Sequence, residues 1–281
     1  MKKLLSIALA LLMFAFVLTG CAKSKDAASQ AASDAVSDAV TAAENGDTAE
    51  AAKAAEAAVE DVQQNGADSD TASAFYSAYI ETKSAVLNRL MDGIGNNPDT
   101  MMSAFSFLGI SMSDLYLLPA LYFGLGEGSV ATALSMMGAK DVTYDEQGNQ
   151  YTVTYKNAED KESSLTGTYD KGKSLVAVGK TNGKEDVFAQ TYRTSFGYVG
   201  QFYFIAEDGT ATLYQVSISG SDGVFGVISG VDRPAPLTGN EGADFPKAVK
   251  EWYAITGSTI TGLTADGKQI NFEYVPSENA G

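Results

Sequence analysis

The chain has no histidine and only one cysteine, Cys21, among its 281 residues. Ser-His-Asp triads and Cys-His dyads are therefore excluded, because both need an imidazole as the general base. A single cysteine cannot form a disulfide within the chain, and zinc sites made of cysteine and histidine lack their ligands. The sequence thus predicts no metal site and no cofactor.

Positive charge is also scarce. Lysine and arginine together number 19 against 35 acidic residues, which gives a formal net charge of −16. Nucleic acids and anionic membrane surfaces attract proteins through clustered lysine and arginine. We therefore expect no nucleic-acid partner, and we interpret the acidic excess as a feature that keeps the chain soluble.

The first residues differ from the rest of the chain. Lys2 and Lys3 precede an uncharged apolar run over residues 4–17, which has the length of the hydrophobic region of a secretory signal peptide. A helix that spans a bilayer needs about 20 apolar residues, so this run is short for a membrane span. The segment therefore predicts export of the chain.

Leu18-Thr19-Gly20-Cys21 follows directly. It resembles the lipobox of bacterial lipoproteins, in which a leucine, a small residue and a glycine precede an obligatory cysteine. The resemblance covers residues 1–21 and implies that signal peptidase II recognises Leu18, Thr19 and Gly20 and cuts before Cys21. It also implies a diacylglyceryl group on the Cys21 thiol, which would hold the mature chain on the extracytoplasmic face of the cell membrane. Cleavage by the ordinary signal peptidase, or an uncleaved anchor, is the alternative.

Residues 21–70 form an alanine-rich acidic segment. Alanine is the strongest helix former, and Asn45-Gly46 and Asn65-Gly66 divide the segment into short helical stretches. Its apolar stripe is too small for a free-standing folded unit. Two interpretations stay open: a spacer that lifts a domain off the membrane, or a helical or flexible tail with no role beyond solubility.

A folded core begins after this segment. Residues 71–91 carry aromatic and aliphatic side chains at helical spacing, which predicts an amphipathic helix. The next part, residues 101–139, is strongly apolar, and Pro119 and several glycines interrupt it. These breaks predict three short helices, over residues 100–108, 112–123 and 129–138.

Methionine is concentrated in this apolar part. Five of the eight methionines lie there: Met101, Met102, Met112, Met136 and Met137. One interpretation is that these helices are buried against a sheet. The other is that the flexible thioether side chains form an adaptable lid over a lipid-like apolar ligand.

The period of the apolar residues changes to two after Lys140. Tyr151, Val153 and Tyr155 alternate with threonines, and the same alternation recurs to residue 274, as is typical of strands with one buried face. Turn residues such as Asn182-Gly183, Asp208-Gly209, Asp222-Gly223 and Asp266-Gly267 separate the runs. The pattern predicts about nine or ten strands between residues 141 and 275, in a sequential antiparallel meander.

Three stretches depart from this simple alternation. Residues 196–206 are apolar on both faces, which predicts the central strand of the sheet, covered on both sides. Glycines punctuate residues 220–230 and predict a bulged or closely approached strand. Residues 244–254, which contain Trp252, are expected to form a helical insert.

Residues 167–174, Gly-Thr-Tyr-Asp-Lys-Gly-Lys-Ser, match the phosphate-binding pattern GxxxxGK[ST]. That motif works only when a helix begins at the lysine, so that backbone N–H groups point at the phosphates. Here the β-branched run from Leu175 to Val178 follows, which favours a strand. We therefore interpret the match as a hairpin turn and predict no nucleotide binding.

Together these patterns predict an α+β fold, with N-terminal helices packed on a large antiparallel β-meander that forms a curved sheet or a partly open barrel. The predicted organisation is a signal peptide over residues 1–20, a tether over 21–70 and a domain over 71–281. Within the domain, residues 71–140 form the helical part and residues 141–281 the β part.

Three functions fit such a chain. The first is a non-catalytic binding or interaction module of the cell envelope, whose partner is a protein, peptide or glycan. The second is a carrier or sensor of an apolar ligand held between the helices over residues 101–139 and the sheet. The third, and weakest, is an enzyme such as a glycosidase that works through two carboxylates. The acidic composition provides many carboxylate pairs and therefore does not identify one.

The lipid anchor is directly testable by the substitution Cys21→Ser. Two acyl chains anchor a protein stably, at about 0.8 kcal/mol per buried methylene, and serine cannot carry them through a thioether. We expect the variant to leave the membrane fraction of cells that express it, whereas Lys173→Ala stays membrane-bound. Unchanged membrane fractionation of C21S would contradict lipidation at this residue.

Overall fold

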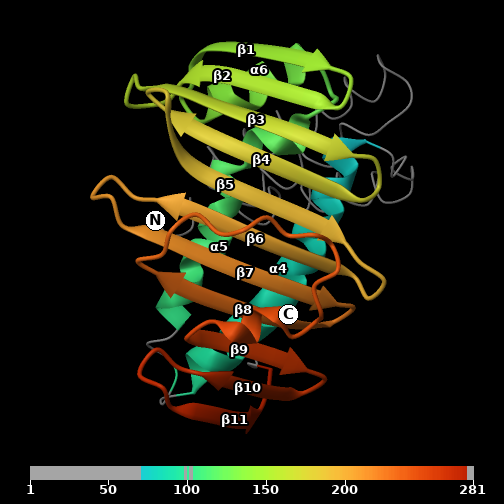
Figure 1. Ribbon diagram of the computed structural model, residues 1–281, viewed down its shortest axis with the longest axis vertical. Helices are drawn as coiled ribbons and strands as arrows, with labels where there is room; N and C mark the ends of the chain where they lie inside the picture. Colours follow the sequence, from blue (N-terminus) through green and yellow to red (C-terminus); the bar gives the residue numbers. More distant parts are fainter. Residues whose placement is uncertain (1–70, 98–99, 101–103, 277–281) are drawn as a thin grey trace, which may run out of the picture.

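In the computed structural model, the described residues are 71–97, 100 and 104–276. The lipobox with Cys21, the predicted tether and the methionines Met101 and Met102 lie outside them. The described chain forms a group of helices followed by one large sheet (Figure 1).

Helix α4, Ala72–Asn96, is the longest helix among the described residues. The hydroxyl of Thr71 caps it by accepting a hydrogen bond from the Ala74 backbone N–H at 3.1 Å. The helix extends beyond the predicted end at residue 91 because its last turns are buried. A Cβ on Gly93 would lie 2.2 Å from Ile260 Cδ1, so this glycine allows close packing on the sheet and Ile94 is fully buried.

The three short helices differ from the predicted boundaries. They are α5 (Ala104–Tyr116), the 3-10 helix η2 (Leu118–Tyr122) and α6 (Glu127–Met136). The predicted break between residues 108 and 112 is wrong, because α5 runs through Gly109. A Cβ at that residue would lie 1.9 Å from the Tyr214 hydroxyl, so the glycine makes room for a side chain of the sheet. Pro119 lies at the start of η2, where its missing N–H is tolerated.

The sheet has eleven antiparallel strands in sequential order, with β6 in the middle. The strands are β1 (Lys140–Gln147), β2 (Gln150–Lys156), β3 (Glu162–Asp170), β4 (Ser174–Thr181), β5 (Lys184–Arg193), β6 (Tyr198–Ile205), β7 (Ala211–Ser219), β8 (Asp222–Ser229), β9 (Glu251–Thr256), β10 (Thr259–Leu263) and β11 (Gln269–Glu273). The sheet is not closed, since within the described chain β1 and β11 each pair with one neighbour. The predicted α+β fold with a curved β-meander is therefore confirmed, with one or two strands more than expected.

Two local predictions in the β part are wrong. The expected helical insert is only the short 3-10 helix η3 (Phe245–Ala248), and Trp252 lies in strand β9. Pairing with both β8 and β10 decides this, because it buries Tyr253 and Ile255 completely. The turn expected at Asp222-Gly223 lies two residues earlier, and Asp222 pairs with Ser219 in the ladder.

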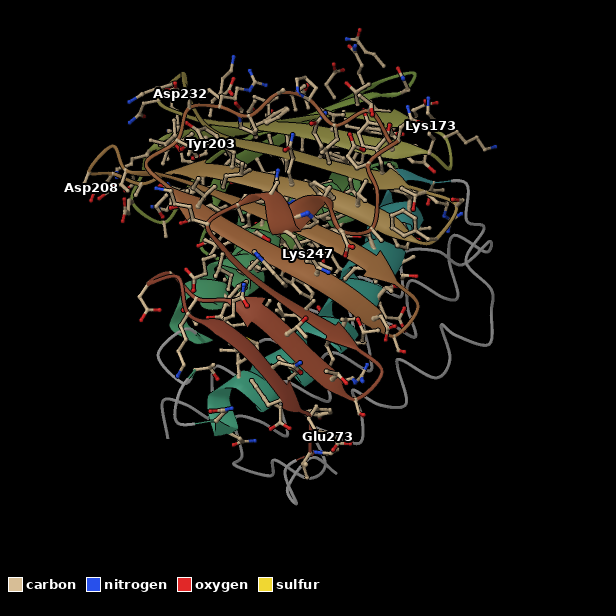
Figure 2. All side chains as sticks on the ribbon, turned by 60° about the horizontal axis from the view of Figure 1, so that its bottom comes forward. Lys173, Tyr203, Asp208, Asp232, Lys247 and Glu273 are labelled. Carbon is tan, nitrogen blue, oxygen red and sulfur yellow. The ribbon has the colours of Figure 1, made fainter. Side chains whose placement is uncertain are left out.

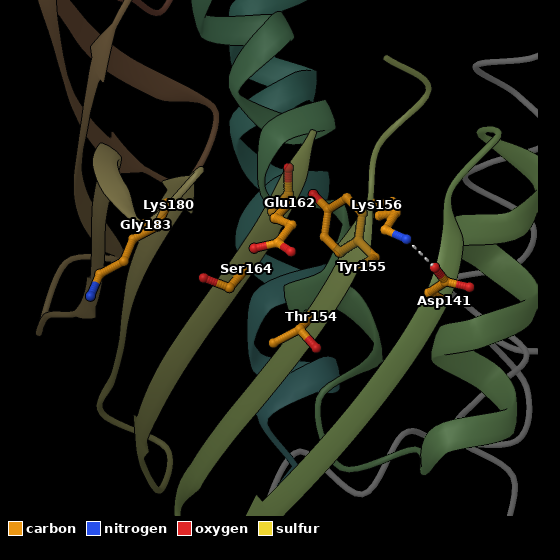
Figure 3. A pocket seen from close by; sticks show the side chains of 9 residues that line it. Asp141, Thr154, Tyr155, Lys156, Glu162, Ser164, Lys180 and Gly183 are labelled. Atoms are coloured by element: carbon orange, nitrogen blue, oxygen red, sulfur yellow. Dashed lines mark hydrogen bonds and ion pairs between the residues drawn. The ribbon is translucent and has the colours of Figure 1, made fainter. Parts of the chain in front are cut away.

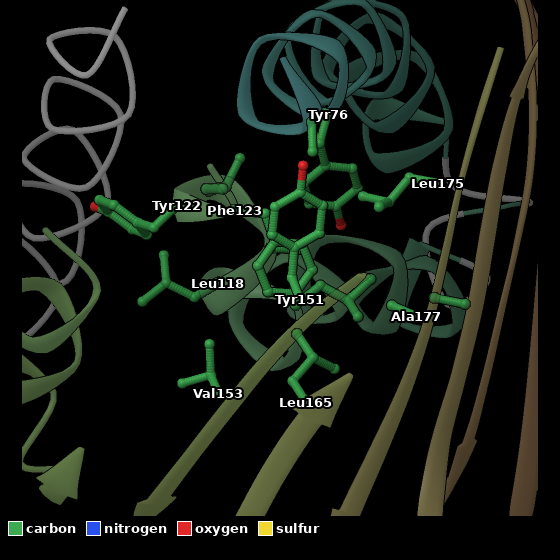
Figure 4. Close-up of a cluster of buried hydrophobic side chains, with 14 of the residues drawn as sticks. Tyr76, Leu118, Tyr122, Phe123, Tyr151, Val153, Leu165, Leu175 and Ala177 are labelled. Carbon is green, nitrogen blue, oxygen red and sulfur yellow. The ribbon is translucent and has the colours of Figure 1, made fainter. Parts of the chain in front are cut away.

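The helices cover one face of the sheet, which we call the inner face (Figure 1). Figure 4 shows part of the core there, where Phe123 stacks on Tyr151 of β2 with ring centroids 5.0 Å apart. A Cβ on Gly167 would lie 2.2 Å from the Phe123 ring, so strand β3 needs glycine under this ring. A second part of the core packs α4 and α5 on β7 to β11.

Residues 230–250, which we call the strap, cross the opposite or outer face over the middle of the sheet (Figure 1). Gln201 Nε2 donates hydrogen bonds to the Gln190 side chain at 2.7 Å and to the Ala235 carbonyl at 2.9 Å. The Leu237 backbone N–H donates to Gln190 Oε1 at 2.8 Å. These buried glutamines satisfy each other and the strap backbone, so β6 is covered on both faces as predicted.

The predicted close approach to the glycine-rich strand β8 is confirmed at Gly226. A Cβ there would lie 2.7 Å from both the Pro246 carbonyl oxygen and Val249 Cγ2 of the strap. We expect Gly226→Ala to lower the free energy of unfolding by about 1–3 kcal/mol, the usual cost of overpacking. Urea denaturation measures this.

The matched control is Gly242→Ala, in the same strap. A Cβ at Gly242 has no atom within 4 Å, so we expect a change within about 0.5 kcal/mol. Equal free energies of unfolding for G226A and G242A would contradict the close contact between the strap and β8.

Candidate functional site

The residues that the sequence singled out lie in different places. Met112 lies in α5 and Met136 ends α6. Met137 follows α6, and its side chain is 39% exposed, so it faces solvent rather than the interior. Among the described helices, none is both long and apolar enough to cross a bilayer.

The segment that matches the phosphate-binding pattern is a hairpin. Strand β3 ends at Asp170 and strand β4 begins at Ser174, with no helix after Lys173. The Lys173 ammonium lies 3.2 Å from the Asp170 carboxylate, and Figure 2 shows Lys173 at the margin of the sheet. The geometry that cradles phosphates is therefore missing from this segment.

Side chains fill the region between η2 and strands β2 to β4, where a carrier would hold its ligand. Tyr76 of α4, Phe123 and Tyr151 meet there over Leu165 and Ala177 (Figure 4). All five are buried in one continuous hydrophobic cluster. This part of the interior is a packed core.

One ion pair lies inside the helical layer. Lys83 of α4 is 2% exposed, and its ammonium donates to Asp114 Oδ1 of α5 at 2.5 Å. Burial raises the pKa of Asp114, while Lys83 and a hydrogen bond from Ser113 oppose the rise. The lysine also lies 5.5 Å from the centre of the Tyr79 ring. The pair links α4 to α5, with the lysine buried and the Asp114 side chain 22% exposed.

The outer face of β1 to β3 is different, because it is exposed and rich in hydroxyl groups. Thr143, Thr154 and Ser164 lie side by side on adjacent strands, and Thr143 and Thr154 share a hydrogen bond of 2.5 Å. Thr166 and Thr168 continue the row along β3. Such a face is well solvated and needs no cover of its own.

A pocket of about 370 Å³ opens on this face, near the β2–β3 and β4–β5 turns (Figure 3). We call it the outer groove. Its polar lining comes from Asp141, Thr154, Lys156, Glu162, Ser164 and Lys180. Hydroxyls, two ammonium groups and two carboxylates thus surround one concavity of the size at which ligand sites begin.

The charges of the outer groove are partly paired. Lys156 donates to Asp141 at 2.7 Å, and this hydrogen bond raises the pKa of Lys156. Among the described residues, neither Lys180 nor Glu162 forms an ion pair through its side chain. These two groups are therefore available to a ligand that both donates and accepts hydrogen bonds. The described residues contain no group of three or more acidic side chains arranged to hold a metal ion.

The sequence does indicate this surface, through the polar residues that alternate with the apolar residues of the strands. The residues between the buried ones in β2 and β3 are almost all serine or threonine. The lysines and carboxylates of the groove, however, come from four strands and their turns. Only the register between those strands brings them together.

The buried ion pair generates a prediction about stability. We expect Lys83→Met to lower the free energy of unfolding by about 3 kcal/mol, because it leaves the Asp114 carboxylate without its cation. The double variant K83M/D114L should recover most of this loss. Chemical denaturation of both variants makes the comparison, and a double variant as unstable as K83M would contradict it.

The loss in K83M should also depend on pH. Since burial raises the pKa of Asp114 above its ordinary value, the folded state binds this proton more tightly than the unfolded state. The resulting stabilisation is present at low pH and disappears as the pH rises through the raised pKa. The deficit of K83M relative to the parent should therefore be smaller at about pH 4 than at about pH 7.

Comparisons with known proteins identify no relative. No family model, no curated protein and no solved structure matches the chain. Its function is therefore inferred from its own residues.

Proposed function

We propose that the protein is a non-catalytic binding module of the cell envelope, tethered through Cys21 to the extracytoplasmic face of the membrane. The outer groove on strands β1 to β4 is its contact surface. The observation that carries the proposal is a concavity on an exposed face that combines hydroxyls with Lys180 and Glu162, whose side chains form no ion pair within the described part of the chain. The partner that fits this chemistry best is a glycan, whose hydroxyls both donate and accept hydrogen bonds.

The location of the exposed part of the sheet supports the outer groove as the contact surface. Helices pack on the inner face, and the strap covers the outer face of the middle strands. On β4, Val176 and Val178 pack against the cluster that also contacts Val231 of the strap, whereas the outer face of β1 to β3 carries neither the described helices nor the strap. Because its threonine and serine side chains are stably hydrated, it can remain exposed and still exchange water for a polar partner.

Two other functions have weaker support. A carrier of an apolar ligand needs open interior volume, and the region between η2 and strands β2 to β4 is filled. A carboxylate enzyme needs two acidic groups that act together. In the outer groove Asp141 is already bound to Lys156, which leaves Glu162 alone.

The test fills the outer groove without touching the core. Ser164→Trp places a large side chain in the groove, and Thr168→Trp places the same side chain on the same face of β3, outside the groove. The full-length protein is expressed on cells, and purified glycans from the envelope of those cells are added. We expect S164W to bind these glycans at least tenfold more weakly than the parent. T168W should bind as the parent does. Equal binding by all three proteins would contradict the proposal.

A further inference from the structure

The two edges of the sheet differ in how they are protected against pairing with another strand. Strand β1 carries four charged residues, Lys140, Asp141, Asp145 and Glu146. Its register with β2 also shifts between Lys140 and Thr143, as at a β-bulge. Charges and bulges keep an edge strand from pairing with a strand of another chain. Strand β1 is therefore a protected edge.

Strand β11 forms the other edge and lacks this protection within the described chain (Figure 1). Glu273 is its one charged residue, and its ladder with β10 runs without a register shift. Figure 2 shows Glu273 at the margin of the molecule. Val275 follows directly and is 72% exposed. This edge is therefore open to a further strand.

The hydrogen bonds of β11 show which of its backbone groups face the open edge. The Tyr274 N–H donates to the Ser258 carbonyl at 2.6 Å, and the Thr264 N–H donates to the Lys268 carbonyl at 3.0 Å. Hydrogen-bonded and non-hydrogen-bonded pairs alternate along an antiparallel ladder, so the even-numbered residues of β11 bond to β10. The odd-numbered residues direct their N–H and C=O groups to the open edge: Gln269, Asn271 and Glu273.

The inner side of this edge is only partly covered. Ile270 is buried, whereas Phe272 and Tyr274 are partly buried and pack against the same core cluster. The Arg89 guanidinium lies 5.7 Å from the centre of the Tyr274 ring. A neighbouring strand would remove more of these two rings from water, so apolar burial favours pairing at this edge.

We propose that β11 pairs with β11 of a second copy of the chain, antiparallel and about a twofold axis at Asn271. In this register Gln269 lies opposite Glu273 of the second copy, and Ile270 lies opposite Phe272 of the second copy. Each apolar residue thus meets an apolar residue, and the carboxylate meets an amide. The strand is self-complementary, as a twofold interface requires.

Charge also selects this arrangement over the alternatives. A register centred on Glu273 would place two carboxylates opposite each other, and like charges directly opposite destabilise a ladder. Pairing of β11 with β1 of another copy would continue without closing, and the charges and the bulge of β1 oppose it. The register centred on Asn271 pairs all five residues of the strand.

The contact is small, and we expect a weak dimer. Interfaces that bury less than about 1,200 Å² in total are typical of transient complexes. The anchor proposed for Cys21 would raise the local concentration of copies on one membrane. Because β11 lies at the opposite end of the sheet from β1 to β4, pairing leaves the outer groove of each copy open.

Two lysine substitutions on the same exposed face of β11 test the register. The full-length protein is purified in detergent micelles, and sedimentation equilibrium measures its association up to about 100 µM, since contacts of this size are weak. Gln269→Lys brings an ammonium opposite Glu273 of the second copy and should tighten the dimer about threefold. Asn271→Lys brings it opposite itself and should weaken the dimer about fivefold.

Asn271→Pro tests the backbone contact. The Asn271 N–H faces the open edge, and proline is tolerated on an edge strand when the missing N–H faces solvent. We expect N271P to keep the urea midpoint of the parent and to weaken the dimer at least tenfold. A monomeric parent, or equal dissociation constants for Q269K and N271K, would overturn the proposal.

Asn271→Cys identifies the partner on membranes. Residues opposite each other in a hydrogen-bonded pair have Cα atoms about 5.5 Å apart, which a disulfide can join. Oxidation of N271C should give a species of twice the chain mass, whereas Asp145→Cys on β1 and the parent, with Cys21 alone, should not. A disulfide between N271C and a different protein would overturn the proposal.

The dimer does not depend on the outer groove. S164W should associate as the parent does, and N271K should bind glycan through its groove as a monomer. Failure of the glycan test therefore leaves this proposal standing, and the reverse also holds.

Discussion

The fold depends on burying the inner face of an eleven-stranded sheet under the few helices that the structure describes. Helix α4 has 25 residues and is therefore about 37 Å long, whereas the six steps from β4 to β10 span about 29 Å. One helix is thus long enough to run across most of the strands. Its contacts with β4 and with β7 to β10 show that it does so. Helix α6 and η2 cover the early strands that α4 does not reach.

Helix α4 is held close to the sheet by hydrogen bonds of Arg89 and by glycines that leave room for side chains of the opposing layer. Arg89 donates to the carbonyls of Ser221 and Gly257, each at 2.6 Å, and so ties two hairpin turns to the helix. Glycines in the strands and helices accept large side chains from the opposing layer, as Gly167 does for Phe123.

The same packing determines which surfaces remain exposed. The strap and the buried glutamines Gln190 and Gln201 cover the outer face of the middle strands. The early strands keep a hydrated outer face with a polar groove, while the helices cover their inner face. The two sides of these strands are thus chemically different, since the outer side carries hydroxyls and charged groups and the inner side is a packed apolar core.

Local sequence was sufficient for the features that depend on neighbouring residues. The alternation of apolar residues and the turn chemistry determined the antiparallel meander, because strand faces and tight turns are properties of a few consecutive residues. The absence of histidine and the single cysteine excluded whole classes of chemistry without any fold. The lipobox resemblance is likewise contained in residues 1–21, and the anchor stays a prediction.

Only the tertiary structure decided the features that depend on distant residues. Trp252 is in a strand because β9 pairs with both β8 and β10. Gly109 lies within α5, where its missing side chain leaves the space that the Tyr214 hydroxyl occupies. The outer groove exists because the register between strands β1 to β4 brings together residues that are separated in the chain. No periodicity along the sequence encodes the ion pair between Lys161 and Glu207, because it joins two turns that are far apart in the chain.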